Sequence, residues 1–357
     1  MKQAGLQSVP DGYLAYARRK TLIISLIFIF VVLLGLYAIN AGSASLSPVQ
    51  VLQTLLGRAE GSANIIVWQI RLPRVLAAVV AGAGLSVAGC VMQNILRNPL
   101  ASPFTLGVSQ GAAFGAALGI VALGAGSAQR TVADGLLVNN PYLVTLSAFS
   151  AAMAATLVII FLSRYKGVSP EAMVLAGVAL GSFFSACTII LQYFASDVQV
   201  ASIVFWTFGD MGRASWRDLA IMAVVIAVAL LYFMANRWNY NALDSGEETA
   251  RGLGVEVERI RLVSMFLASL VTAVAVSFLG IIGFIGLIGP HMMRRLLGGD
   301  HRFLIPASGV IGGLLLLASD TLARAVIAPV VLPVGAVTSF LGAPMFLYLL
   351  FRGGNRK

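Results

Sequence analysis

Few side chains in this sequence could carry out bond chemistry. The sequence holds two histidines, His291 and His301, and two cysteines, Cys90 and Cys187, which are too few for a typical catalytic metal cluster. The motifs H-E-x-x-H, G-x-S-x-G and G-x-x-x-x-G-K-[ST] are absent. The sequence therefore predicts a protein that is not an enzyme, holds no metal ion and binds no cofactor of its own.

Carboxylates that could relay protons across a membrane are also scarce. Asp320 can pair with Arg324 one helical turn later, and Glu171 follows Pro170 at an expected helix start, where a negative charge is favourable. An ion-coupled transporter would instead keep ionisable residues near the bilayer midplane. A transport protein of this composition must take its energy from a partner, while an ATP-independent secondary transporter stays open as an alternative of another class.

The chain around these residues is that of a membrane protein. Of its 357 residues, 59% are hydrophobic and 11% are charged, and the mean hydropathy is +0.92, whereas a soluble domain carries about 25% charged residues. Apolar stretches of about 17 residues or more recur, and each can cross a hydrocarbon core of ~30 Å. These patterns predict an all-α polytopic membrane protein with about ten transmembrane helices, at residues 21–41, 75–96, 103–124, 141–163, 170–195, 218–235, 262–279, 282–297, 303–323 and 334–351.

The basic residues between these spans indicate orientation. The formal net charge is +10, but Lys and Arg are spread over the loops rather than gathered on one face, which argues against nucleic-acid binding. With the amino terminus inside, 17 of the 24 Lys and Arg residues fall on the inner side, and the outer ones are Arg58, Arg71, Arg74, Arg130, Arg213, Arg217 and Arg324. The bias predicts an even number of spans, a retained first span and two cytoplasmic termini.

Small residues and prolines indicate how the spans pack and where they end. The second span contains AGAG at 81–84 and then Gly89, a face that lets helices approach closely. Pro290 and Pro306 are expected at helix starts or ends, where the missing N–H group costs little. The second span is therefore expected to be a packing element rather than a binding site.

Two polar segments interrupt the apolar pattern. The outer one, residues 196–217, predicts a short interfacial helix. The inner one, residues 237–261, is the longest charged stretch, and its glycines predict two short helices separated by a glycine turn. Such a platform predicts a docking surface on the cytoplasmic face, with a solvated loop as the alternative.

Several short strings, in order along the chain, carry a resemblance to a known family. They read RLPR at 71–74, GCVMQ at 89–93, NPLASP at 98–103, GFIGL at 283–287, DHR at 300–302 and GAP at 342–344. Over about residues 15–352 the sequence resembles the FecCD/BtuC-type permeases, which are the membrane subunits of type II ABC importers for ferric siderophores, haem and cobalamin.

The resemblance implies the architecture and partners of such an importer. It implies one transmembrane permease domain over residues 1–357, with a BtuC-like inverted repeat of spans 2–5 and 7–10 and with residues 237–261 as the cytoplasmic coupling loop. It also implies a second permease copy in a homodimer, contact with membrane lipid, and a place in the inner or plasma membrane of a prokaryote. Two ABC ATPase subunits would bind ATP and magnesium, and a soluble binding protein would deliver the substrate.

The resemblance further implies three groups of functional residues. Arg71, Arg74 and Arg324 match outer arginines that receive acidic residues of the binding protein, and we expect these side chains to be exposed; lipid-headgroup contact is the alternative. The ATPase coupling residues are Gly246, Glu247, Glu248, Arg251, Gly252, Leu253 and Gly254, preceded by Ser245 where relatives often have leucine. The cytoplasmic gate matches Asn98, Leu100, Ser169, Pro170 and Glu171, although Asn-Pro-Leu can also be a simple helix stop.

The function implied is inward transport of an iron chelate, most simply a ferric siderophore, powered by ATP in a separate subunit. Haem and cobalamin are the alternatives within the family. Because no charged pocket is predicted at the midplane, substrate choice is expected to belong mostly to the binding protein.

Overall fold

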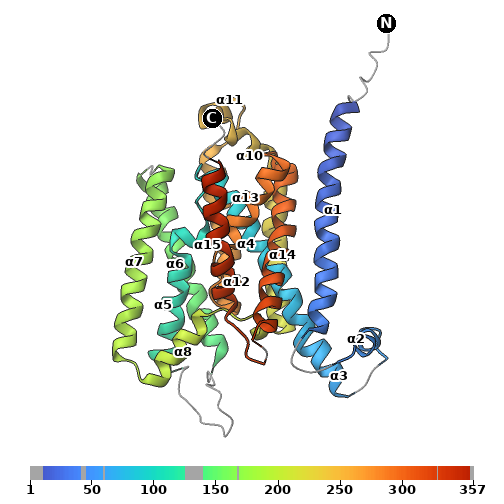
Figure 1. Cartoon of the computed structure of the whole chain (residues 1–357). Helices are drawn as coiled ribbons and strands as arrows, with labels where there is room; N and C mark the ends of the chain where they lie inside the picture. Colours follow the sequence, from blue (N-terminus) through green and yellow to red (C-terminus); the bar gives the residue numbers. More distant parts are fainter. Residues whose placement is uncertain are drawn as a thin grey trace.

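The chain forms a bundle of long helices. A computed structural model describes residues 11–41, 46–58, 61–124, 140–166, 169–327 and 329–353, and these residues contain helices but no strands (Figure 1). Within the described ranges, ten helices correspond to the ten predicted spans: α1 (Asp11–Asn40), α4 (Leu72–Ile95), α5 (Val108–Val121), α6 (Pro141–Lys166), α7 (Pro170–Phe194), α9 (Trp216–Ala235), α12 (Val257–Leu279), α13 (Ile285–Leu297), α14 (His301–Ala325) and α15 (Val334–Gly353). The all-α prediction is confirmed. Arg130 and residues 1–10 and 354–357, which enter the orientation argument, lie outside the described residues.

The polar segments form short helices, as predicted. Residues 196–217 contain α8 (Asp197–Thr207) and a 3-10 turn, η3 (Met211–Arg213). Residues 237–261 contain α10 (Arg237–Asp244) and α11 (Glu247–Gly252), separated at Gly246, whose φ of 112° favours glycine. The remaining elements are α2 (Pro48–Leu55), α3 (Ser62–Asn64), the π-helix η1 (Ile65–Arg71) and the 3-10 helix η2 (Pro103–Leu106).

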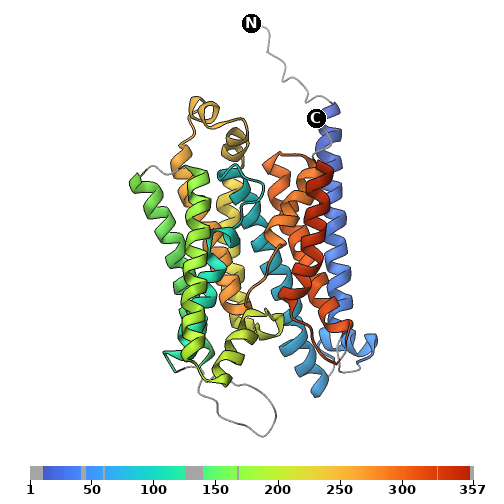
Figure 2. The ribbon, with the colours of Figure 1, turned by 60° about the vertical axis from the view of Figure 1, so that its left-hand side comes forward.

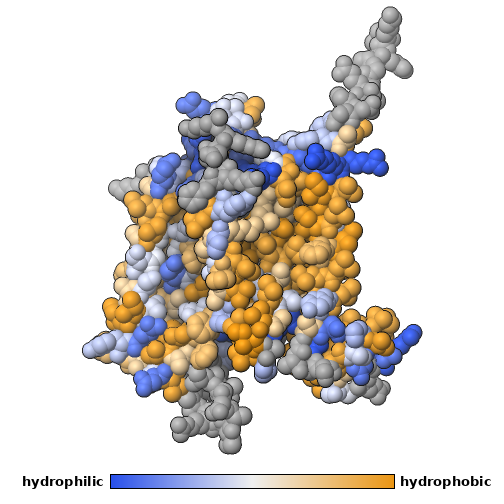
Figure 3. All heavy atoms as spheres, in the orientation of Figure 1, coloured by the Kyte–Doolittle hydropathy of each residue, from blue (hydrophilic) through white to orange (hydrophobic). Residues whose placement is uncertain are grey.

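Length and surface both suit a membrane. In the described part of the chain, seven stretches are long and apolar enough to cross it: Tyr13–Asn40, Ser62–Ile95, Pro141–Tyr165, Pro170–Phe194, Trp216–Ala235, Val257–Leu279 and His301–Ala325. Figure 3 shows apolar side chains over the middle of the molecule and hydrophilic ones gathered toward its two ends. The start of α1 and the end of α15 lie at the same end as α10 and α11 (Figures 1 and 2).

Helix α4 packs on α12, α13 and α14 at the centre of the bundle. Its small residues allow backbones to meet: Gly82 lies against the carbonyl of Gly312, and Gly89 lies against the backbone of Gly286. A Cβ atom at either α4 glycine would overlap the neighbouring backbone. The predicted packing face of the second span is therefore confirmed, since close approach gives the van der Waals contact that holds helices together in lipid.

Two prolines do not lie where the sequence predicted them. Pro290 and Pro306 are inside α13 and α14 rather than at helix ends, so that prediction is wrong. A proline within a helix cannot donate to the carbonyl four residues before it, and membrane helices tolerate this loss when neighbouring helices compensate. For Pro290 that carbonyl belongs to Gly286, and its oxygen is the atom that lies closest to the Cβ position of Gly89. The Gly286 carbonyl, to which Pro290 cannot donate, therefore lies at the contact between α13 and α4.

Helix α13 also begins later than predicted. Its expected span was 282–297, but Ile285 is its first residue. Gly280 has φ 81°, residues 280–283 are not helical, and Phe284 has φ 66°, a left-handed conformation that is uncommon for a residue with a side chain. Residues 280–284, which connect α12 to α13, are therefore not helical.

The two groups of four helices named by the predicted repeat share a length pattern. In α4 to α7, the second member, α5, has 14 residues and follows η2 and Gly107. In α12 to α15, the second member, α13, has 13 residues and follows the non-helical segment at 280–284. Each group therefore places a short helix after a long central one, α4 with 24 residues or α12 with 23.

Candidate functional site

A carboxylate joins two arginines at the end of the bundle opposite α10 and α11. In α4, Nε and Nη2 of Arg74 donate to Oδ1 of Asp320 at 3.0 and 2.8 Å, and Nε of Arg324 donates to Oδ2 at 3.1 Å. The side chain of Asp320 is 0% exposed, so it has replaced its water with the two guanidinium groups. We call these three residues the arginine clamp; it ties α4 to α14. The predicted pair of Asp320 and Arg324 is confirmed, and Arg74 is the partner that sequence spacing did not reveal.

The last turn of α1 supplies further acceptors. Nη1 of Arg71 donates to the carbonyls of Ile39 and Asn40 at 2.8 and 3.0 Å, and Nη1 of Arg324 donates to those of Ala38 and Ala41 at 3.2 and 2.7 Å. Helix carbonyls in a last turn have no intrahelical partner and attract positive charge. Arg71 and Arg324 thus hold the end of α1 against the bundle.

These contacts contradict the expected exposure of the three arginines. The side chains of Arg74 and Arg324 are 12% and 8% exposed, and Arg71 is buried. The expectation failed because the acceptors, Asp320 and the end of α1, are distant from Arg71 and Arg74 in sequence. Their docking role is a separate matter and stays a prediction.

The coupling loop presents a small exposed surface. Glu248, Arg251, Gly252, Leu253 and Gly254 are exposed, and the side chain of Leu253 is 69% exposed. Glu247 differs, because one of its oxygens pairs with Arg261 and the other lies 4.0 Å from Arg251. Its negative charge is therefore already used inside the chain.

Two polar connections run from the coupling loop to the last turn of α4. From α10, Asp244 Oδ1 accepts a hydrogen bond from Asn94 Nδ2 at 2.7 Å, and the same nitrogen donates to the carbonyl of Tyr240 at 3.0 Å. From α11, Glu247 pairs with Arg261, whose Nε donates to the carbonyl of Ile95 at 3.1 Å. We call these the coupling links.

Each of the coupling links has one buried partner, which strengthens the contact. Asn94 and Arg261 are buried, and burial raises the pKa of the Asp244 carboxyl, an effect that Arg294 and the bond from Asn94 oppose. A buried polar group without its partner costs about 1–3 kcal/mol. Asn94 and Arg261 were not predicted as functional residues, although a polar residue within an apolar span and an arginine at the edge of another were visible in the sequence.

The predicted gate residues occupy two turns, one directly after α4 and one at the start of α7. Asn98 Oδ1 accepts from the backbone N–H of Leu100 at 2.9 Å, which fixes the turn after α4. Ser169 caps α7, where Pro170 is the first residue and Glu171 is exposed. The segment after Leu100 meets α7 farther along, because Thr105 and Leu106 lie against Gly177. The turn after α4 therefore leads to a segment packed on α7, and no hydrogen bond joins Asn98 to Glu171 among the described residues.

Metal ligands are not assembled in the part of the chain that the structure describes. No group of three or more His, Cys, Asp or Glu residues is placed there to hold an ion. The arginine clamp and the coupling links instead use their charged and polar groups to connect helices.

Comparisons with known proteins agree with this arrangement. The profile of the FecCD transport family matches residues 27–352. A provisionally named ABC transporter permease of Methanocaldococcus jannaschii is 52% identical over 344 residues, covering 96% of this chain and 98% of its own. The hemin transport system permease protein HmuU of Yersinia pestis is 36% identical over 346 residues, covering 94% and 97%.

A solved structure extends the likeness to three dimensions. It is described as an inward-facing conformation of a provisionally assigned metal-chelate type ABC transporter, and its TM-score is 0.80 at 29% identity. The match covers 93% of this chain and 99% of the solved one. With the family match, the ten helices and the apolar middle of the bundle, the chain is a multi-pass ABC transporter permease that belongs to the FecCD transport family.

Proposed function

We propose that this chain is the membrane subunit of an ATP-driven importer that carries an iron chelate, with a ferric siderophore as the first candidate, into the cytoplasm. Two ATPase subunits would hydrolyse ATP beneath a homodimer of the chain, and a soluble binding protein would deliver the chelate. Both termini would be cytoplasmic. Haem and cobalamin are the alternative substrates.

The coupling links are the observation that supports this proposal. An exposed loop with its own short helices is joined by partly buried polar contacts to the end of α4, directly before the turn at Asn98. A loop connected in this way can pass a displacement from a partner to the membrane helices. The hemin permease of Yersinia pestis and the metal-chelate type transporter support the chelate class.

The candidate residues take separate parts in the proposal. Glu248, Arg251 and Leu253 would contact the ATPase, and Asn98, Leu100 and Glu171 would form the cytoplasmic gate. Arg71, Arg74 and Arg324 would receive carboxylates of the binding protein. Since the arginine clamp already occupies Arg74 and Arg324, docking would have to share or exchange the carboxylate of Asp320.

Transport in a reconstituted system tests the proposal. The chain, the ATPase and the binding protein encoded with it would be placed in lipid vesicles, and uptake of radiolabelled ferric siderophore, haemin and cobalamin would be compared. We expect uptake of the siderophore that needs ATP and the binding protein and persists with a protonophore. Uptake that continues without ATP and stops with the protonophore would instead establish the secondary transporter.

A further inference from the structure

A groove between α6 and α12 extends to the coupling loop, and apart from Arg251 the proposed transport mechanism gives its lining side chains no part. Its volume is about 820 Å³. Six of its lining side chains are apolar and lie on the two facing helices: Leu157, Ile160, Val257, Leu262, Val263 and Phe266. Three arginines also line it, Arg164 near the end of α6, Arg259 in the first turn of α12, and Arg251 in α11.

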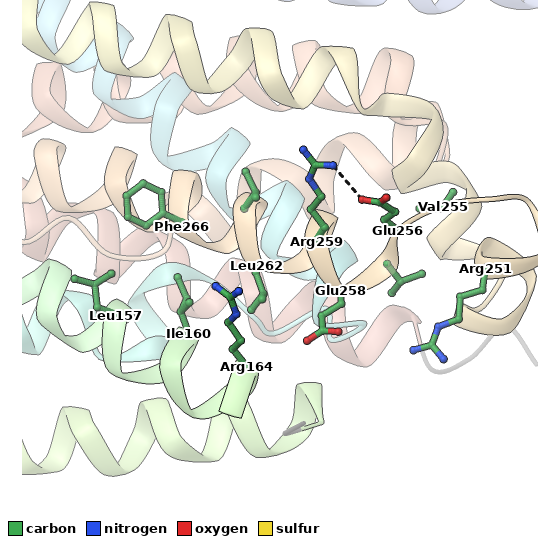
Figure 4. Close-up of a pocket in the computed structure, with 12 residues that line it drawn as sticks. Leu157, Ile160, Arg164, Arg251, Val255, Glu256, Glu258, Arg259, Leu262 and Phe266 are labelled. Carbon is green, nitrogen blue, oxygen red and sulfur yellow. Dashed lines mark hydrogen bonds and ion pairs between the residues drawn. The ribbon is translucent and has the colours of Figure 1, made fainter. Parts of the chain in front are cut away.

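The apolar and charged residues occupy different ends of the groove. Figure 4 shows Phe266, Leu157 and Ile160 at one end and Arg251 with Glu256 and Glu258 at the other, while Arg164 and Arg259 lie between them. The change follows the helix axes, from the apolar middle of the bundle toward the coupling loop. A phospholipid has the same order of chemistry, because its acyl chain lies in the membrane and its phosphate lies at the boundary.

The charges favour a negatively charged headgroup. The lining holds three arginines against the two carboxylates Glu256 and Glu258. Glu256 pairs with Arg259 at 3.1 Å, but both side chains are exposed, and such pairs are weak. Arg164 is exposed and makes no ion pair with any residue that the structure describes. Guanidinium groups bind phosphate through paired hydrogen bonds, and basic pockets between membrane helices are typical sites for anionic lipid headgroups.

We propose that the groove between α6 and α12 binds one anionic phospholipid, with its phosphate at Arg164 and an acyl chain along Leu157, Ile160 and Phe266. The lipid would fill the space beside the start of α12, which also carries Arg261 of the coupling links. It would therefore brace the helix to which α11 is connected.

Lipid retention by the purified full-length chain tests the site. The chain would be exchanged into micelles with equal amounts of phosphatidylglycerol and phosphatidylcholine, and bound lipid would be counted by native mass spectrometry. We expect one phosphatidylglycerol to be retained in preference to phosphatidylcholine. Arg164→Gln should lower that preference about fivefold, which is the contribution of one basic residue near a lipid surface. Arg18→Gln is the control, because Arg18 is also exposed but lies on α1, away from the groove; it should leave the preference unchanged.

Two further variants test the headgroup contact and the acyl-chain contact separately. Glu258→Gln should raise the preference for phosphatidylglycerol, because it removes a negative charge from the lining. Leu157→Gln should lower the retention of both lipids by similar factors, because it places a polar group against the acyl chain. Circular dichroism would confirm that the variants keep their helices.

Three results would overturn the assignment. Equal losses in Arg164→Gln and Arg18→Gln would show a general effect of surface charge. Displacement of the lipid by inorganic phosphate at millimolar concentration would show a simple anion site. Loss of the lipid when the ATPase binds would show that the groove is a protein contact.

Discussion

The arginine clamp makes a strong prediction about stability. Asp320→Asn keeps the size of the side chain and removes its charge, so Arg74 and Arg324 lose the carboxylate that they share. Their side chains are 12% and 8% exposed, so water can replace little of the interaction with the carboxylate. Removing one partner of a buried ion pair costs about 3–5 kcal/mol when the charge that stays behind has no other partner. Here the half-exposed carboxylate of Asp210 lies 3.4 Å from Nη2 of Arg74 and can offset part of that loss. We expect the variant to lose free energy of unfolding near the lower end of that range.

Unfolding in mixed detergent micelles, followed by circular dichroism, measures this loss. Asp197→Asn is the matched control, because Asp197 is exposed in the first turn of α8, and a change there should stay within about 0.5 kcal/mol. The double variant Asp320→Asn with Arg324→Gln should lose less than the sum of the single variants, because one unpaired cation is removed with the carboxylate. An Asp320→Asn protein as stable as the control would refute the reasoning, and would mean that water reaches the two arginines.

The same variant probes docking if it stays folded. Without the internal carboxylate, Arg74 and Arg324 would be available to acidic residues of the binding protein. We expect tighter binding-protein association at low salt, with a steeper loss as salt rises, because two arginines without their shared internal carboxylate attract the acidic residues of the binding protein more strongly. Weaker docking in a folded Asp320→Asn protein would show that the clamp prepares the docking surface instead of competing with it.

Other predictions address the links, the packing and the coupling surface. Asn94→Ala should lower transported substrate per ATP hydrolysed several-fold while ATPase activity continues, because α10 loses its bond to α4; equal losses of both would indicate general unfolding. Gly89→Ala should cost about 1–3 kcal/mol of unfolding free energy, since its Cβ would overlap the backbone of Gly286. Gly252→Ala is its control, with no other atom within 4 Å of the added Cβ, and should be neutral or stabilising. Leu253→Asp should reduce co-purification of the ATPase at least tenfold without changing the unfolding of the chain alone, and full association would contradict the coupling role.

Helices and local pairs were accessible from the sequence. The length of each apolar stretch predicts a helical span, because a segment in lipid must form all its backbone hydrogen bonds within itself. The glycine at 246 predicts the break between α10 and α11. Asp320 and Arg324 are one turn apart, so helical periodicity predicts their contact.

Contacts between distant segments were not accessible. Arg74 and Asp320 are 246 residues apart, and no local pattern shows that α4 and α14 lie side by side there. The burial of Arg71 likewise depends on the place where α1 ends in space. Pro290 lies inside α13, and the Gly286 carbonyl to which it cannot donate faces Gly89 of α4, which is a property of the pair of helices and not of either sequence alone.

Helix α4 carries the arginine clamp near its start and the coupling links in its last turn, about 30 Å apart at 1.5 Å per residue. Its backbone contacts with α13 and α14 leave little room for bending between them. If the binding protein acts on the first end and the ATPase on the second, the two bind to opposite ends of one rigid body. Their affinities must then be thermodynamically linked: the factor by which the bound ATPase state changes affinity for the binding protein equals the factor by which the binding protein changes the affinity of that state.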